Sequence, residues 1–177
     1  DAVFLPVDHE YYNSVSDEVM NILKKYSDVF EQAGVDEAYL DVTQRVEGDF
    51  DRAVELARRI KEEVKRSKEL TCSIGIGPNK IVAKIASDFQ RPDGLTIVKP
   101  EGVQSFLSPL PVNRLLGVGV KTQSLMESLG IRTIGDLAGY DVKKLVELFG
   151  EKLGVYFHNA SLGIDNRPVK ERGEASS

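Results

Sequence analysis

Apolar residues recur at helical spacing in three segments of the first half of the chain. These segments are 11–26, 52–68 and 78–89. In the second and clearest of them, most polar positions are Arg, Lys or Glu, and one face is apolar: Ala53, Leu56, Ala57, Ile60 and Val64. Ser14 or Ser16 is the predicted N-cap of the first helix, and Pro78 or Asn79 begins the third. The charged face of 52–68 is interpreted as a solvated surface rather than a binding patch.

Strand-forming residues gather in runs outside these helices. The runs are 1–7, 29–30, 38–43, 70–76 and 95–98. The second and third runs flank Gly34, and they predict a β-hairpin whose turn lies near that glycine. The run 70–76 alternates, and it predicts one buried side: Leu70, Cys72, Ile74 and Ile76. Helices beside an antiparallel sheet indicate an α+β sandwich of the ferredoxin-like type.

Beyond residue 99 the pattern changes to short helices that glycine and proline separate. They are predicted over 100–107, 112–116, 120–129, 134–139, 141–149 and 151–162. We therefore place a domain boundary near residue 99, between a sheet-containing domain at 1–98 and a small all-α domain at 99–165. The polar residues 166–177 are interpreted as a linker.

The hairpin carries an adjacent acidic pair, Asp36 and Glu37, just after its turn. Neighbouring side chains diverge in the middle of a strand, because successive residues point to opposite faces. Where a strand leaves a turn, two carboxylates can instead be aimed at one point, as a hard cation such as Mg²⁺ requires. The alternative is a pair of solvated turn residues, which is the commoner origin of such a pair. The surrounding apolar strand, with Tyr39, Leu40 and a further acid at Asp41, favours a site.

Composition limits the class of protein. The 177 residues are 41% hydrophobic and 29% charged, as in an ordinary globular protein. No apolar run is long enough to span a bilayer, and no signal peptide opens the chain, so no membrane partner is expected. The single cysteine, Cys72, excludes an internal disulfide and indicates a reducing compartment, for which we expect the cytoplasm.

The segment 34–41 resembles the second catalytic motif of the Y-family translesion DNA polymerases of the DinB (DNA polymerase IV) class. That motif is Ser-Ile-Asp-Glu-Ala-Tyr-Leu-Asp, and this chain matches it at six of eight positions. It departs with Gly34 for serine, which can alter a turn hydrogen bond, and with the conservative Val35 for isoleucine.

Two further segments resemble this family in the family's order. Asn79-Lys80, Ala83-Lys84 and then Arg91-Pro92-Asp93-Gly94 are similar to a palm segment that ends in Lys-Pro-x-Gly. The start of a helix and lysines at i and i+4 present one cationic face, and the arginine can meet the triphosphate of an incoming nucleotide bidentately. Taken singly, Lys80 and Lys84 would be ordinary surface lysines.

The third segment, 115–137, resembles the helix-hairpin-helix of the family's thumb domain. Gly117 and Gly119 let the chain turn and let backbone amides approach a phosphate, Val118 lies between them, and Lys121 adds a charge. Such a contact positions DNA without reading its sequence. The alternative is a glycine turn between packed helices.

The resemblance implies template-directed synthesis past damaged bases by a nucleotidyltransferase with primer–template DNA and dNTP as substrates. Two Mg²⁺ ions would be held by Asp36, shared by both, and by Glu37 on the primer side. Lys80, Lys84 and Arg91 would bind the nucleotide phosphates. Net charge is −5, with −6 over 1–98 and +1 over 99–177, so DNA binding by this chain alone should be weak and salt-sensitive.

Compared with the family pattern, the chain starts after the first palm strand, which carries another catalytic aspartate, and after the fingers. It stops in the linker toward a C-terminal DNA-binding domain, through which a sliding clamp could be contacted. We therefore expect most of a palm plus a thumb, with little or no polymerase activity on its own. Robust Mg²⁺-dependent primer extension by these 177 residues would overturn that expectation.

Two other classes of function stay open. A non-catalytic helix-hairpin-helix DNA-binding module predicts that Asp36→Ala leaves every measurable function intact. Another palm-type enzyme, such as a nucleotide cyclase, shares a ferredoxin-like core and carboxylate-bound Mg²⁺, but it gives no reason for the helix-hairpin-helix at 115–131.

Overall fold

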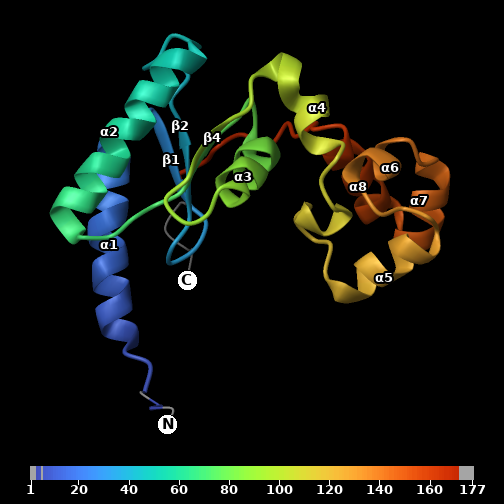
Figure 1. Cartoon of the computed structure of the whole chain (residues 1–177), viewed down its shortest axis with the longest axis horizontal. Helices are drawn as coiled ribbons and strands as arrows, with labels where there is room; N and C mark the ends of the chain where they lie inside the picture. The colour runs from blue at the N-terminus through green and yellow to red at the C-terminus, as the bar shows by residue number, and fades with distance from the viewer. Residues whose placement is uncertain (1–2, 5, 172–177) are drawn as a thin grey trace. The chain divides into compact units, whose positions relative to one another are not determined.

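The computed structural model describes residues 3–4 and 6–171 (Figure 1). The chain divides into two compact units. One unit extends to Cys72 and takes in the chain again from Val169, and the other is Ser73–Pro168. No helix within the described ranges is long and apolar enough to cross a membrane. The predicted strand at 1–7 is wrong for the residues described there, 3, 4, 6 and 7, because none of the described strands pairs with them; the remaining three lie outside the described residues.

The first unit contains α1 (His9–Lys25), β1 (Val29–Gln32), β2 (Ala38–Asp41) and α2 (Phe50–Lys68). The predicted N-cap of α1 is wrong, because Asp8 caps the helix by accepting a hydrogen bond from the Tyr11 amide at 3.0 Å. Ser16 lies inside the helix and its hydroxyl donates to the carbonyl of Val35. The predicted apolar face of α2 is confirmed, with Leu56 half-buried and the other members buried: Ala53, Ala57, Ile60 and Val64.

The predicted hairpin is confirmed as the antiparallel pair β1–β2, in which Phe30 faces Leu40 and Gln32 faces Ala38. Its second strand ends at Asp41, two residues before the predicted end. The connection is the loop 33–37, so the turn does begin at the glycine that the sequence indicated.

The second unit opens with β3 (Ile74–Ile76), α3 (Lys80–Phe89) and β4 (Leu95–Ile97). The predicted antiparallel pairing is wrong here, because β3 and β4 are parallel. A helix joins them, and a crossover of this kind brings the second strand back in the direction of the first. β3 is also shorter than the predicted 70–76. The predicted buried side is wrong: Leu70 precedes the paired part of the strand and is 44% exposed, and Cys72, Ile74 and Ile76 are only half-buried.

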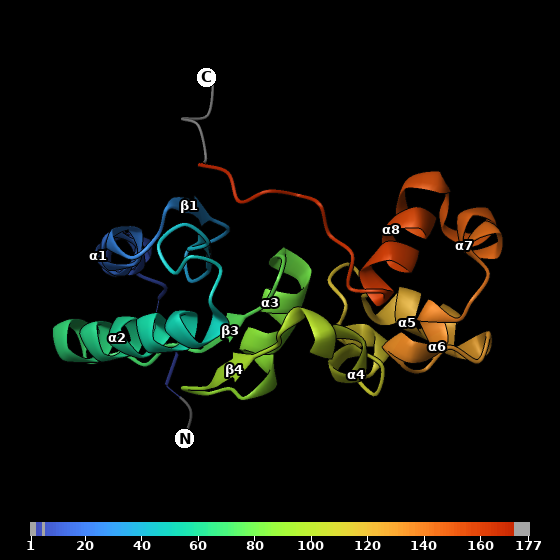
Figure 2. The ribbon, with the colours of Figure 1, turned by 90° about the horizontal axis from the view of Figure 1, so that it is seen from above.

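Seven short helices follow within the described residues, and each lies within a predicted segment. The α-helices among them, α4 to α8, are labelled in Figures 1 and 2. They are η1 (Pro100–Gly102), α4 (Val103–Leu107), η2 (Val112–Arg114), α5 (Val120–Ser128), α6 (Ile134–Ala138), α7 (Val142–Phe149) and α8 (Glu151–Ser161). Their buried side chains share one hydrophobic core with α3, from Ile81 through Leu107 and Leu145 to Phe157. The α+β class with a following all-α region is therefore confirmed, and the boundary near residue 99 stays a prediction.

The contact between α3 and β3 depends on Gly75. A Cβ atom at this position would lie 2.1 Å from the Ala83 carbonyl oxygen and 2.3 Å from the Ser87 amide nitrogen. Neither neighbour is a flexible side chain, so a larger residue would have to push the helix off the strand.

We expect Gly75→Ala to lower the free energy of unfolding by about 2 kcal/mol or more, because the added methyl overlaps helix backbone. Denaturant titration of this variant and of a control variant, each compared with the unmodified chain, would measure this. Gly102→Ala is the matched control, since a Cβ there meets nothing within 4 Å, and it should change stability little. Equal effects of the two substitutions would contradict the account.

Candidate catalytic and phosphate-binding sites

Asp36 and Glu37 lie in the loop between β1 and β2, with Asp36 exposed and Glu37 half-buried. The carbonyl oxygen of Glu37 accepts hydrogen bonds from the Ala33 amide at 2.9 Å and from the Gly34 amide at 3.1 Å. The Gln32 side-chain amide donates to the Gly34 carbonyl at 3.0 Å, and the hydroxyl of Ser16 on α1 donates to the next carbonyl. The backbone that carries both carboxylates is thus held on either side of the turn.

The donor set at this loop fits a hard divalent cation, because two adjacent carboxylates supply charged oxygen ligands. Among the residues that the structure describes, no three His, Cys, Asp or Glu side chains are grouped as a metal site. Asp41, the other acid of the motif, is engaged locally, because its Oδ1 accepts from the Thr43 amide at 2.9 Å. Asp36 and Glu37 would therefore supply part of a coordination sphere.

Helix α3 carries Lys80 at its first position and Lys84 one turn later. Lys84 and Arg91 are brought together by a residue that the sequence analysis missed, Asp88. The Lys84 Nζ lies 3.4 Å from one carboxylate oxygen of Asp88, and an Arg91 nitrogen lies 2.7 Å from the other. The i,i+4 and i,i+3 spacings on a helix were the signal that could have identified this group.

The start of α3 is bound within the chain. The Asn79 side chain caps the helix by accepting from the Val82 amide at 3.1 Å, and the Ile81 amide donates to the carboxylate of Asp165. These partners offset the positive end of the helix dipole. The contribution of the helix start to the cationic face stays a prediction, and two of its amides already have partners within the chain.

The predicted DNA-binding hairpin connects η2 to α5. Gly117 has φ +89°, a conformation that favours glycine, and Gly119 is the N-cap of α5 without a side-chain hydrogen bond. Both glycines and Lys121 are exposed, whereas Val118 is buried and anchors the turn in the core. The structure thus brings the two glycines and the lysine together on one exposed turn, and Val118 contributes backbone and packing.

Comparison with known families matches the chain in two places. Residues 1–88 match the family described as impB/mucB/samB, and residues 113–165 match the thumb domain of DNA polymerase iota. The first match contains Asp36, Glu37, Lys80 and Lys84, and the second contains the glycine hairpin.

Two curated relatives of this chain are both named DNA polymerase IV. DNA polymerase IV of Nitrosopumilus maritimus is 53% identical over 172 residues, which are 97% of this chain and 47% of that protein. DNA polymerase IV of Methanosarcina acetivorans is 49% identical over 178 residues, 97% of this chain and 49% of the relative. The chain spans about half the length of the curated relatives it matches.

Solved structures agree with these relatives in fold. DinB from Sulfolobus solfataricus superimposes with a TM-score of 0.88 at 35% identity, over 94% of this chain and 49% of that one. An insertion ternary complex of Dbh DNA polymerase gives a TM-score of 0.89 at 35% identity, over 94% of this chain and 48% of that one. Family models, named relatives and three-dimensional likeness agree, and we conclude that the chain belongs to the Y-family of DNA polymerases.

Proposed function

We propose that this chain supplies palm and thumb elements for template-directed DNA synthesis past damaged bases, in which a nucleotide is transferred from a dNTP to a primer 3′-hydroxyl. The observation that carries the proposal is the pair Asp36–Glu37, held adjacent in a hydrogen-bonded hairpin loop. Relatives named DNA polymerase IV across 97% of the chain support it.

Asp36 and Glu37 would hold Mg²⁺, with Asp36 shared between two ions and Glu37 on the primer side. Bound Mg²⁺ would make the primer hydroxyl more acidic and would balance the negative charge on the phosphates of the incoming nucleotide. The chain itself would contribute two carboxylates fixed next to one another. The hydrogen bonds of the loop at Gly34 and Val35 hold the backbone that carries them. Further oxygen ligands are needed to complete an octahedral shell.

Lys80, Lys84 and Arg91 would bind the phosphates of the nucleotide. Asp88 holds Lys84 and Arg91 near each other before any ligand binds. The repulsion between the two cations is therefore offset by the protein itself. An entering triphosphate would then compete with the Asp88 carboxylate for both cations. Arg91 can bind two oxygens at once, which favours it for this role.

The hairpin Gly117–Lys121 would bind the DNA backbone. The exposed glycines allow a phosphate to approach main-chain amides at the uncapped start of α5, and Lys121 adds a point charge. The partners are thus primer–template DNA and dNTP. Contact with a sliding clamp and a location in the cytoplasm stay predictions.

Substituting the acidic pair tests the metal site. We expect Asp36→Asn or Glu37→Gln to weaken Mn²⁺ binding by about tenfold or more, because a charged ligand is lost. Paramagnetic broadening of nearby amide signals during a Mn²⁺ titration would measure this binding. Asp17→Asn, an exposed acid on α1, is the control and should change nothing. A non-catalytic DNA-binding module would be favoured if Mn²⁺ bound all three variants as it binds the parent chain.

A second test addresses the phosphate site. Arg91→Ala and Lys84→Ala should each weaken binding of a dNTP, measured by calorimetry, by about tenfold, because each removes charge-assisted hydrogen bonds. Arg91→Lys should retain part of the affinity, since charge remains but the bidentate geometry is lost. Lys65→Ala on the exposed face of α2 is the control, and an equal loss there would point to non-specific attraction.

The hairpin is tested by salt dependence. Lys121→Ala should weaken binding to duplex DNA of any sequence, and the slope of log affinity against log salt should decrease by about 0.9, as for one lost phosphate contact. Fluorescence anisotropy at several salt concentrations would measure this. The same Lys65→Ala variant should leave the slope unchanged, and an unaltered slope for Lys121→Ala would argue against a hairpin contact with DNA.

A further inference from the structure

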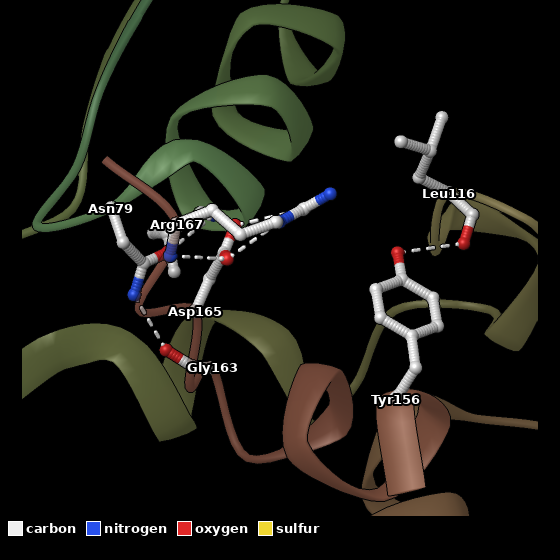
Figure 3. Close-up of polar contacts among 7 residues, drawn as sticks. Asn79, Leu116, Tyr156, Gly163, Asp165 and Arg167 are labelled. Carbon is white, nitrogen blue, oxygen red and sulfur yellow. Dashed lines mark hydrogen bonds and ion pairs between the residues drawn. The ribbon is translucent and has the colours of Figure 1, made fainter. Parts of the chain in front are cut away.

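The segment that leaves α8 folds back onto the start of α3 (Figure 3). At Gly163 the chain turns with φ +69°, and its carbonyl accepts a hydrogen bond from the Asn79 side chain at 2.7 Å. A Cβ at Gly163 would lie 2.3 Å from a methyl of Val103, so only glycine fits this turn. Asn79 therefore has two functions, because it caps α3 and also holds the segment after α8.

Two residues further on, the side chain of Asp165 is only 3% exposed and is fully engaged. Its carboxylate accepts from the Arg167 guanidinium at 2.8 and 2.9 Å, from the Arg167 amide at 3.1 Å, and from the Ile81 amide in the first turn of α3. Burial acts to raise the pKa of Asp165, but these hydrogen bonds and the guanidinium charge outweigh it and hold the pKa below its ordinary value. The pair is therefore charged at neutral pH.

Arg167 continues this set of contacts toward the hairpin. Its guanidinium carbon lies 5.9 Å from the centroid of the Tyr156 ring, within range of a cation–π interaction. The Tyr156 hydroxyl in turn donates to the Leu116 carbonyl at 2.9 Å, immediately before the glycine turn (Figure 3). A Cβ at Gly117 would lie 3.7 Å from the same ring, so Tyr156 also packs against the turn. Continuous contacts thus join the start of α3 to the hairpin.

We propose that Asp165 and Arg167 are positioning residues that hold the helix-hairpin-helix turn in place against α3, through Tyr156. The inference depends on the proposed function of that turn as the DNA-backbone contact. The buried carboxylate acts through its partners: it fixes Arg167, Arg167 fixes the tyrosine, and the tyrosine fixes the Leu116 peptide group. Held in this way, the turn is pre-organised, and a bound phosphate need not first order it.

The proposal makes a prediction opposite to simple electrostatics. Removing a negative charge ordinarily strengthens binding to DNA or leaves it unchanged. We expect Asp165→Asn instead to weaken DNA binding by at least about fivefold. The slope against log salt should stay that of the parent chain, because no phosphate contact is lost. Glu147→Gln, which neutralises an exposed acid on α7, is the matched control and should not weaken binding.

The experiment compares the complete 177-residue chain with Asp165→Asn, Tyr156→Phe, the corresponding double variant, Lys121→Ala and the Glu147 control. DNA affinity is measured by anisotropy over a salt series, and folding by circular dichroism and amide hydrogen exchange. Tyr156→Phe removes one hydroxyl and leaves the ring, so it serves even where Asp165→Asn unfolds the chain. We expect both single variants to weaken binding, the double variant to lose less than the two effects combined, and exchange at 117–119 to accelerate.

The outcomes separate the two proposals. Suppose that Lys121→Ala loses DNA binding, while Tyr156→Phe and folded Asp165→Asn bind DNA as the parent chain does. That result would overturn the positioning role and leave the proposed DNA contact intact. Parent-like binding by Lys121→Ala, or no DNA binding by the parent chain, would overturn the proposed contact and with it this inference. Additive effects in the double variant would also overturn it, because residues that act through one another must be coupled.

Discussion

The close approach of α3 to β3 is the contact on which the second unit depends. It exists because Gly75 presents no side chain to the helix backbone. Once α3 lies on the strand, its apolar face joins the core that the later helices share. Its first turn then binds the segment after α8, and its last turn places Asp88 beside Lys84 and Arg91. The absence of a side chain at Gly75 therefore determines where the polar contacts of the first and last turns of α3 can form.

How far the sequence could predict this arrangement depends on the range of each interaction. The hairpin loop and the short helices were predictable, because glycines and apolar periods act locally. The parallel pairing of β3 with β4 was missed, because the partner and direction of a strand are set by contacts distant in the sequence. The helix between the two strands was the one local sign of a parallel crossover. Asp165 was not found, because its partner Ile81 is distant in the sequence and an acid in a polar tail gives no local signal.

Several carboxylates of the chain are engaged in ion pairs or in backbone hydrogen bonds. Asp165 is paired with Arg167, and Asp88 lies between Lys84 and Arg91. Asp136 accepts from the Thr133 and Arg132 backbones in a capping box, which holds the pKa of its carboxyl below the ordinary value. These carboxylates contribute to structure. The ion pairs cancel part of the local field of Asp165 and Asp88, whereas Asp136 keeps its full negative charge, and the net charge stays −5.

Asp36 and Asp165 are the same residue type in opposite settings, and the difference fits the roles that we propose for them. Asp165 is buried, and hydrogen bonds from Arg167 and Ile81 engage its carboxylate. At Asp36 the hydrogen bonds instead hold the backbone on either side, through the carbonyls of Val35 and Glu37, while the side chain is exposed. A metal ligand needs a fixed main chain and an accessible carboxylate, whereas a positioning residue needs a carboxylate that is already bound.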